Sequence, residues 1–443
     1  MVPRIHTGMR ALLLQGPVGT LFTDLHRGLA AQGWDVRRVC IDGGDLWTSG
    51  SDTPVVVWNG RMDWEAWLNA ELDARPARVV VLFGSERPAH RVARKVAQER
   101  GIAVLSLEEG YKRPGYLTAE WGGNNRSSRL AHLPLPEQGE ELKPAAIPPG
   151  MGWIVAWTAI TYTARVMYSL PGQWSLYHRK YVWPMEVARW GRNLMRRRAG
   201  VRSDAATMAL LEGPWAGLYD VLALQVPGDS SLVCGGDGWT TERFLDEALR
   251  SFALHAPADR KLVAKVHPLA RGHADDGALF MACAERYGVA DRVAVVQAGP
   301  LAPVLAHARG LAAITSTSTL AAIERGLPTL VLGEGITRRP DLAICGPEAS
   351  AIDRFWVSGP VATPETLAGY RRLLAQESLV PGDAYHPVGR AVAVQSVVAK
   401  IEQTLGAPTP QPMRGNARAT RTATGLSTPK GAPTGLAHAR LSS

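Results

Sequence analysis

The chain has 443 residues, which is too long for one ordinary hydrophobic core and predicts two domains with additional segments. Hydrophobic residues make up 46% of the chain and charged residues 20%, a balance that excludes a wholly disordered protein. The formal net charge of +9 falls to +4 without the five basic residues of the C-terminal tail, so nothing in the charge calls for nucleic acid as a partner.

The cysteines and the N-terminus both favour a reduced, cytoplasmic protein. Cys40, Cys234, Cys283 and Cys345 are far apart and form no CxxC pair, so neither a zinc site nor a disulfide framework is indicated. The apolar run at 11–14 is too short for the hydrophobic region of an export signal.

Residues 1–144 are predicted to form an N-terminal Rossmann-like domain. Apolar strands alternate with segments of helical spacing, which is typical of a doubly wound parallel sheet. The expected strands are 10–14, 36–41, 55–58, 79–83 and 103–107, and the expected helices are 21–32, 64–73 and 89–100. The loops after these strands should open onto one edge of the sheet, where open α/β sheets bind ligands.

Residues 145–205 are predicted to form a helical insert. Segment 151–170 is rich in aromatic residues and contains one charge, Arg165. A basic run follows it: Arg189, Arg192, Arg196, Arg197, Arg198 and Arg202. This pattern is typical of a helix that lies on an anionic membrane surface. Two alternatives stay open: a helical pair packed between the domains with its basic face in water, and a true membrane span.

Residues 206–405 are predicted to form a second Rossmann-like domain that faces the first across a cleft, and 406–443 a disordered tail rich in Pro, Thr, Ala and Gly. The expected strands are 219–224, 261–266, 293–296, 310–314 and 329–332, and the expected helices are 240–253, 276–287, 301–308, 320–325, 364–376 and 390–405. The last helix is placed to return to the first domain and lock the pair.

Three polar groups follow predicted strands. Glu108 and Glu109 end the strand at 103–107, where a carboxylate can act as a base or a nucleophile, or simply cap a helix or pair with Lys112 or Arg113. His267, before Pro268 and near Lys265, is placed to donate to a phosphate, although a single histidine is often only polar surface.

The third group is the hydroxyl segment 315–319, which precedes a predicted helix. Hydroxyls and free N–H groups at a helix start bind anions, although one Ser or Thr is enough for capping. A carboxylate from one domain facing a phosphate site on the other is the arrangement of a nucleotide-sugar transferase. No DxD-like metal site is apparent, and a CMP-sugar has a single phosphate that can be held without a metal, so no cofactor is expected.

Six segments occur in the order LLLQGPVG, IDGGD, FGSERPAHRVA, LEEGYKRPGYLTAEWGGNN, KVHPLARG and TSTSTLAAIERGLPTLVLG. Together they resemble the capsule polysaccharide biosynthesis family, and its shorter KpsS/LipB-like branch in particular. The resemblance implies a GT-B-like fold and a retaining β-Kdo glycosyltransferase. It implies transfer from CMP-Kdo to a phosphatidylglycerol-type lipid at the inner-membrane surface, in capsule assembly and export and alongside other capsule proteins.

The resemblance places the family's motifs on Glu109-Gly110, His267-Pro268 and Ser316 to Ser318, and the other roles are expected from the residue types and their positions. Glu109 is expected to attack or shield the sugar carbon, and Glu108 or Glu120 to assist deprotonation of the acceptor. On the donor side, the phosphate is expected to contact His267, Lys265, Ser316, Thr317 and Ser318. On the sugar and acceptor side, the expected contacts are Arg113, Gln15, Gly16 and Asn125.

Two other functions remain as alternatives. One is a transferase of the same fold that uses another nucleotide sugar, since the cleft motifs do not name the sugar. The other is a non-catalytic, membrane-docked scaffold for capsule assembly, suggested by the aromatic and arginine-rich insert.

Overall fold

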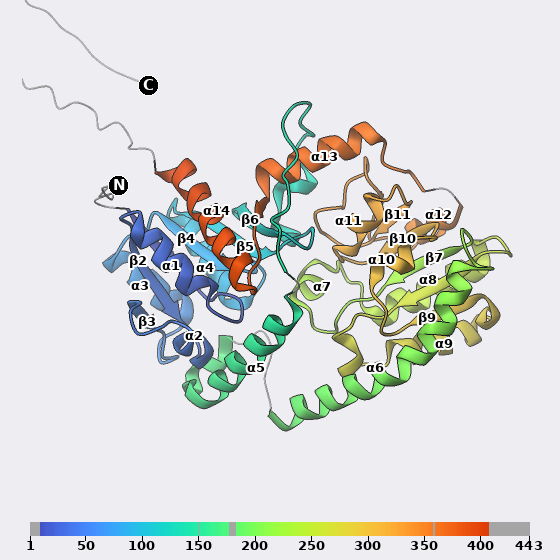
Figure 1. Ribbon diagram of the computed structural model, residues 1–443, viewed down its shortest axis with the longest axis horizontal. Coiled ribbons are helices and arrows are strands. Elements are labelled where there is room, and N and C mark those ends of the chain that lie inside the picture. The colour runs from blue at the N-terminus through green and yellow to red at the C-terminus, as the bar shows by residue number, and fades with distance from the viewer. Residues whose placement is uncertain (1–8, 149, 177–182, 358, 407–443) are drawn as a thin grey trace, which may run out of the picture. The chain divides into compact units, whose positions relative to one another are not determined.

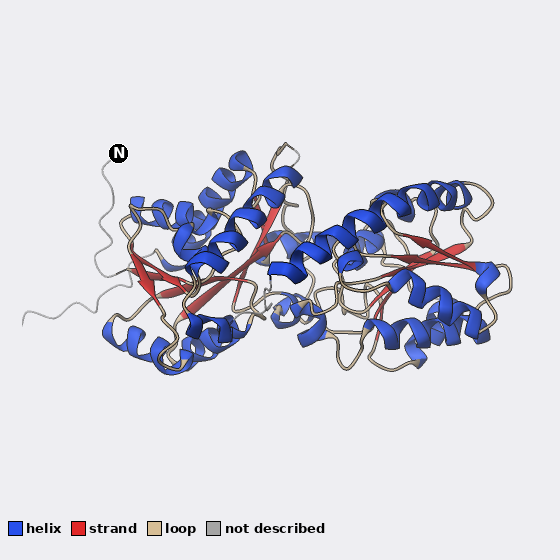
Figure 2. Ribbon diagram, turned by 90° about the horizontal axis from the view of Figure 1, so that it is seen from below, coloured by secondary structure: helices blue, strands red, loops and turns tan. Residues whose placement is uncertain are grey.

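The computed structural model describes residues 9–148, 150–176, 183–357 and 359–406 (Figure 1). The predicted tail at 406–443 therefore lies, except for Gly406, outside the described residues. Within them the chain forms two sheets, each covered by helices on both faces (Figure 2). The predicted GT-B-like pairing of two Rossmann-like units is confirmed by these sheets.

The first sheet has a Rossmann-type strand order. Across the sheet its strands are β3 (Val55–Val57), β2 (Asp35–Cys40), β1 (Arg10–Leu13), β4 (Val79–Phe83), β5 (Ala103–Glu109), β6 (Tyr116–Trp121) and β13 (Leu379–Pro381). The pairs from β3 to β5 are parallel, whereas β6 is antiparallel to both β5 and β13.

Alternate side chains of the first sheet enter two different cores. Leu13, Val79 and Val81 pack with α1 (Leu21–Ala31) and α14 (Pro387–Leu405). Leu12 and Val80 pack on the other face with α3 (Trp64–Ala74) and α4 (Pro88–Glu99). Because both faces are covered, β4 reads as a continuous apolar run, VVVLF, rather than as an alternating one.

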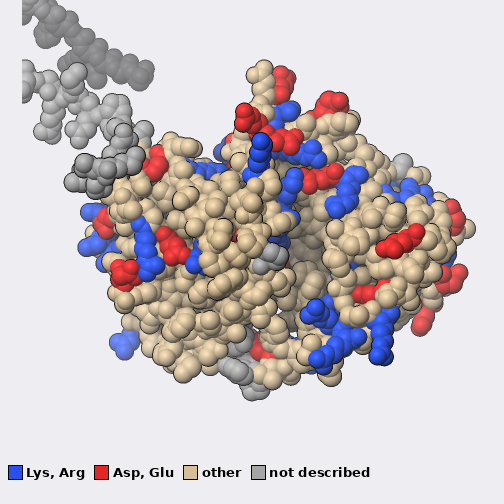
Figure 3. Space-filling model, in the orientation of Figure 1, with Lys and Arg blue, Asp and Glu red and all other residues tan. Residues whose placement is uncertain are grey.

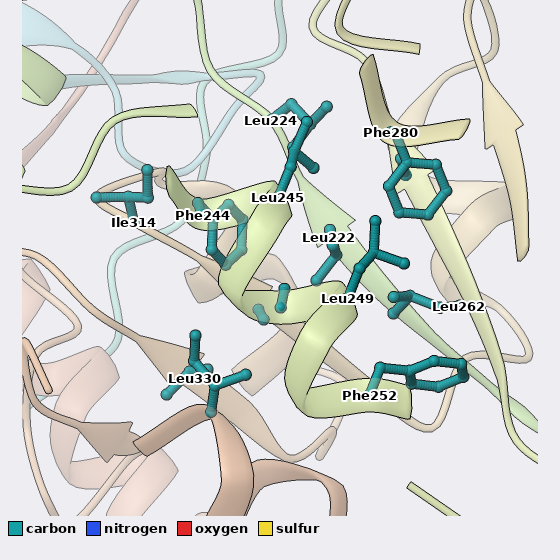
Figure 4. Close-up of a cluster of buried hydrophobic side chains, with 14 of the residues drawn as sticks. Leu222, Leu224, Phe244, Leu245, Leu249, Phe252, Leu262, Phe280, Ile314 and Leu330 are labelled. Carbon is teal, nitrogen blue, oxygen red and sulfur yellow. The ribbon is translucent and has the colours of Figure 1, made fainter. Parts of the chain in front are cut away.

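The second sheet has the same order within its own strands: β9 (Val293–Val296), β8 (Lys261–Lys265), β7 (Tyr219–Ala223), β10 (Gly310–Ala313), β11 (Thr329–Val331) and β12 (Ile344–Cys345), all parallel. Figure 4 shows its larger core, in which Leu245 and Leu249 of α8 (Thr241–His255) lie beside Leu224 and Leu222 of the strand region. The remaining helices of this half are α7 (Ser230–Gly235), α9 (Asp276–Arg286), α10 (Leu301–Leu305), α11 (Ser318–Ile323), α12 (Ser350–Val357) and α13 (Pro364–Glu377).

The end of the described chain returns to the first sheet. Leu379 and Val380 of β13 pair with Thr118 and Leu117 on the free edge of β6, and α14 then packs against α1. The ring nitrogen of Trp34 donates to Glu402 of α14, which fastens this contact. The expected return of the last helix to the first domain is confirmed. The predicted domain 206–405 must be corrected, because β13, which lies within that range, is a strand of the first sheet and completes the edge of β6.

The insert also differs from its predicted bounds. It contains α5 (Met151–Tyr168) and α6 (Trp183–Glu212), and α6 continues seven residues past position 205 into the second half. None of the helices in the described residues is both long and apolar enough to cross a membrane. The interpretation of 151–170 as a span therefore receives no support.

One face of α5 is packed tightly on α2 (Gly43–Trp47). A Cβ on Gly43 would lie 2.6 Å from the carbonyl carbon of Tyr168, so only glycine allows this approach. Beside it, Arg165 Nε lies 2.7 Å from Asp42 Oδ2, and both side chains are almost completely buried. The single charge of the apolar segment is thus one half of a buried ion pair.

Replacing Arg165 with methionine should destabilise the fold strongly, because Asp42 would be left buried without its cation. We expect a loss of about 3 kcal/mol in the free energy of unfolding, measured by urea titration. Arg27→Met is the matched control, since Arg27 pairs with Asp52 on the surface and should contribute less than about 1 kcal/mol. Equal effects of the two substitutions would contradict the importance of the buried pair.

Candidate active site

Glu108 and Glu109 lie at the carboxyl end of β5, but they have different surroundings. Tyr385, from the segment before α14, donates its hydroxyl to Glu109 Oε1 at 2.6 Å, and Arg113 pairs with Glu109 Oε2. Glu108 lies over Gly84, where an added Cβ would approach its Oε2 to 3.1 Å. Burial raises the pKa of Glu108 to about 7, although the charge of Arg87 acts in the opposite direction.

A polar chain connects Arg87 to the insert. Arg87 Nη1 donates to Gln15 Oε1 at 3.2 Å and to the carbonyl of Gly16 at 3.1 Å. Gln15 Nε2 donates in turn to Asp42 Oδ2 at 2.8 Å and to Asp45 Oδ2 at 3.2 Å. Asp42 also forms an ion pair with Arg165 of α5. Gln15 and Gly16, predicted to contact sugar or acceptor, thus serve in the structure to hold Arg87 beside Glu108.

Glu120 is held in a buried hydrogen-bond network whose partners differ from those of Glu108 and Glu109. Its Oε1 accepts from the Ser378 hydroxyl at 3.1 Å, and its Oε2 accepts from Ser128. Tyr111 is bonded to it as well, and burial raises the pKa of Glu120 to about 7. These contacts join β6 to its neighbours. They give no support to the predicted help in deprotonating an acceptor.

The sequence predicts a ligand contact at Asn125, whereas the side-chain amide that is bonded within the fold belongs to its neighbour, Asn124. Asn124 is completely buried, donates Nδ2 to the carbonyl of Leu107 at 3.0 Å and accepts the Ser85 hydroxyl at 2.7 Å. Asn125 has a positive φ of 52° and donates its backbone N–H to Tyr111 Oη at 2.7 Å. Asn124 therefore fixes the end of β5, and the ligand contact predicted for Asn125 stays a prediction.

His267 follows β8 in the second half and is partly buried. The backbone N–H of Leu269 donates to its Nδ1 at 3.2 Å, so Nδ1 carries no proton. Burial lowers the pKa of His267, the charge of Asp229 raises it, and Lys265, Arg113 and Arg271 lower it further. A neutral ring with Nδ1 occupied presents Nε2–H as a donor, which is what a phosphate oxygen needs.

Lys265 lies beneath this turn rather than on its surface. Its Nζ donates to the carbonyl of Val266 at 2.7 Å, and burial together with Arg271 lowers its pKa to about 8. The predicted contact between Lys265 and a phosphate stays a prediction.

In the hydroxyl segment 315–319, the two end residues bond to other parts of the fold, whereas the three central residues are more exposed. Thr315 exchanges hydrogen bonds with Gln225, and the buried Thr319 bonds to Ser316 O and to Thr337 Oγ1, both at 2.7 Å. The three residues between them, Ser316, Thr317 and Ser318, are only partly buried, and Ser318 Oγ donates to Ser316 Oγ at 2.7 Å. The helix begins at Ser318, two residues earlier than predicted.

Several contacts bring the two halves of the site together. Lys112 Nζ lies 2.7 Å from Glu324 Oε1, directly after α11. Asp229, which follows β7, acts electrostatically on both Glu108 and His267, and Arg113 of the first half also acts on His267. The carboxylate pair and the His267 turn therefore share one electrostatic environment.

The sequence interpretation missed Arg87, Asp229 and Tyr385. Arg87 and Asp229 lie in the loops after strands β4 and β7. The rule that ligands bind beyond the carboxyl ends of parallel strands would have identified both residues. Tyr385 carried no such signal, because it reaches Glu109 only through the return of the chain end.

Among the residues that the structure describes, no three His, Cys, Asp or Glu side chains are grouped so that they could hold a metal ion. That catalysis needs no metal stays a prediction, which metal depletion can test.

The raised pKa of Glu108 makes the stability of the fold depend on pH. In the unfolded chain the carboxyl ionises near 4.5, whereas the folded pKa is about 7, so ionisation favours unfolding as the pH rises through this window. Relative to Glu108→Gln, the wild-type chain should lose stability between pH 5 and pH 8 in urea titrations. Glu65→Gln, which removes a surface partner of Lys95, should show no such change with pH. A pH-independent difference for Glu108→Gln would contradict the assignment.

Comparison with known proteins agrees with the resemblance seen in the sequence. Relatives include the capsule polysaccharide export protein KpsS of Escherichia coli, 28% identical over 340 residues, with 74% of this chain and 86% of that protein covered. The capsule polysaccharide modification protein LipB of Neisseria meningitidis is 29% identical over 395 residues, with 85% and 92% covered.

Among solved structures, the β-Kdo 2,7 transferase of Thermosulfurimonas dismutans KpsC aligns with 88% of this chain and 99% of its own, at 13% identity and a TM-score of 0.39. That likeness is too weak to carry an argument about this chain. Residues 78–385, by contrast, match the model of a whole family, described as capsule polysaccharide biosynthesis protein. The chain belongs to the capsule polysaccharide biosynthesis family.

Proposed function

We propose that the protein is a retaining glycosyltransferase that transfers Kdo from CMP-Kdo to a phosphatidylglycerol-type lipid during capsule assembly. The observation that carries this proposal is the pairing of Glu108 and Glu109 in one half with a neutral, donating His267 in the other. Family membership supports the capsule context.

On the donor side, the bond between the sugar carbon and the CMP oxygen breaks, and its electron pair goes to the phosphate. His267 Nε2–H and the hydroxyls of Ser316, Thr317 and Ser318 stabilise the departing phosphate as donors held in place before the reaction. Glu109 then attacks the oxocarbenium-like carbon or shields one face of it. Arg113, which is exposed and paired with Glu109, has the planar fork that matches the carboxylate of the sugar.

On the acceptor side, the lipid hydroxyl displaces Glu109 and gives its proton to Glu108. A folded-state pKa of about 7 suits this task, because a base works best when its pKa is near the working pH. Two inversions at the same carbon give net retention. Glu120 has no part in this scheme, because Ser128, Ser378 and Tyr111 use its carboxylate.

The insert is proposed to hold the enzyme at the inner-membrane surface, where its lipid acceptor lies. The face of α5 opposite to α2 is exposed and apolar, and exposed apolar side chains on α6 lie among exposed arginines. The exposed apolar side chains include Met151, Val155, Val166 and Met167 on α5 and Val187, Trp190, Leu194, Met195 and Val201 on α6. An apolar face flanked by arginines fits an anionic bilayer surface.

The same exposed face favours the second candidate, a scaffold that docks on the membrane without catalysis. Binding of CMP separates the two, since a scaffold has no use for a nucleotide. CMP at one hundred times its dissociation constant should stabilise the fold by about 2.7 kcal/mol. Protection by UDP but not by CMP would instead indicate a transferase that uses another sugar donor.

Glu109→Gln should reduce transfer of Kdo from CMP-Kdo to phosphatidylglycerol by at least about 100-fold, because the amide cannot act as a nucleophile. Product formation is measured by mass spectrometry of the lipid. Thermal protection by CMP should be retained, and Glu65→Gln serves as the control. Full activity of the Glu109 variant would refute its assignment.

Substituting serine for both Val155 and Met167 should weaken binding to phosphatidylglycerol vesicles by about 10-fold or more, because two apolar side chains no longer enter the bilayer. Vesicle sedimentation measures the effect. The control is the substitution of serine for both Leu254 and Val357, two apolar residues on α8 and α12 that are 66% and 69% exposed. Equal loss for both double variants would exclude α5 as the contact.

A further inference from the structure

One side of α6 faces the turn that carries His267. Asn193 Nδ2 donates to the carbonyl of Pro268 at 2.9 Å. Asn193 Oδ1 accepts from Arg271 Nε at 3.3 Å. A single side chain thus contacts both the residue directly after His267 and the far end of the same turn.

Two arginines extend this contact along the turn. Arg192 donates through Nε and Nη2 to the carbonyl of Gly272, at 3.2 and 2.9 Å. Arg196 Nη1 donates to the carbonyls of Arg271 and Ala274, at 2.6 and 2.7 Å. Charged donors to carbonyls are stronger than neutral ones, so the backbone from 271 to 274 is held firmly against α6.

The approach of the two backbones is close. A Cβ on Gly272 would lie 2.7 Å from the carbonyl oxygen of Arg189, so α6 and the turn are in direct backbone contact there. Further along α6, the buried Asp204 accepts the N–H groups of Gln297, Ala298 and Gly299 at 2.7, 2.5 and 2.9 Å. The helix therefore organises the loops after both β8 and β9.

These contacts divide the basic run of the insert. Arg192 and Arg196 face the His267 turn, and Arg189 pairs with Glu186 on the same helix. Basic side chains still gather along the surface formed by α6 (Figure 3). The interpretation of the whole run as a membrane-facing or solvated face must therefore be corrected for these two arginines.

We propose that α6 positions His267 for the departing phosphate, with Asn193 as the central positioning residue and Arg192 and Arg196 as its supports. This inference rests on the proposed function for its catalytic consequence. The backbone N–H of Leu269, in the same turn, holds Nδ1 of the His267 ring, so the direction of the ring depends on how the turn is held. A helix of the insert thus sets the donor side of the site without contacting the substrate.

Asn193→Leu tests the proposal, because leucine has a similar size and forms neither hydrogen bond. The first measurement is nitrogen NMR of labelled histidines, which needs no substrate. The His267 signals are identified as those that are absent from the spectrum of His267→Gln. The Leu variant should lose the preference for the Nε2–H tautomer. The pKa of His267 should rise toward 6.5 as water enters the loosened turn, since burial is what lowers it.

The second measurement is transfer from CMP-Kdo. Asn193→Leu should lower kcat by about 10-fold or more, since a small misplacement of a catalytic group is costly, and KM for the acceptor should stay unchanged. Combined with His267→Ala, it should cause no loss beyond that of His267→Ala alone. Asn193→Asp, which keeps the acceptor for Arg271 and loses the donor to Pro268, should have an intermediate effect.

Asn69→Leu is the matched control, because Asn69 on α3 also accepts from an arginine, Arg100, and donates to a carbonyl, far from His267 in the chain. It should alter neither the His267 signals nor kcat. Unchanged His267 signals in folded Asn193→Leu would overturn the proposal, as would additive losses in the double variant. Altered signals together with an inactive wild-type enzyme would support the positioning role and reject CMP-Kdo as the donor.

Discussion

The ion pair between Arg165 and Asp42 is the interaction on which the rest of the site depends. Both groups are removed from water, so each needs the other, and neither can be lost without leaving a buried charge. The pair attaches α5 to the carboxyl edge of the first sheet. From Asp42 the polar chain continues through Gln15 to Arg87, which lies beside Glu108. The environment of a candidate base therefore begins in the insert.

The two adjacent carboxylates illustrate how burial assigns different chemistry to identical groups. Glu109 has a tyrosine hydroxyl and a guanidinium as partners, one on each carboxylate oxygen. Glu108 has fewer donors and a raised pKa, which suits a group that takes up a proton. A transferase with separate nucleophile and base needs this kind of division. It arises here because neighbouring residues on a strand point to opposite sides.

Much of the fold could be predicted because its signals are local. The apolar runs at 79–83 and 103–107 are strands, and Thr363 caps α13, with Pro364 at its first position, as the residue types favour. The His267 turn could be placed for the same reason. Arg165 also gave a signal, since a lone charge in an apolar segment needs a partner, but the sequence could not say that this partner is Asp42.

What could not be predicted depends on contacts between distant residues. Glu120 resembles a third active-site carboxylate until Ser378, more than 250 residues away, is seen to bond to it. Asn124 and Asn125 are indistinguishable in sequence, and only the fold decides which one is buried. Arg192 and Arg196 look like part of a uniform basic run, although the loop that they hold lies about 75 residues later. Local propensity carries no information about such pairs.

The pairing of β13 with β6 has a consequence for the way the protein is made. The ribosome releases β6 long before β13, and at roughly 5–20 residues per second the interval is some tens of seconds. During that time the edge of the first sheet and the surface of α1 that α14 later covers are open to other chains. The first sheet therefore cannot be completed until the end of the chain has been made, whereas all strands of the second sheet precede β13.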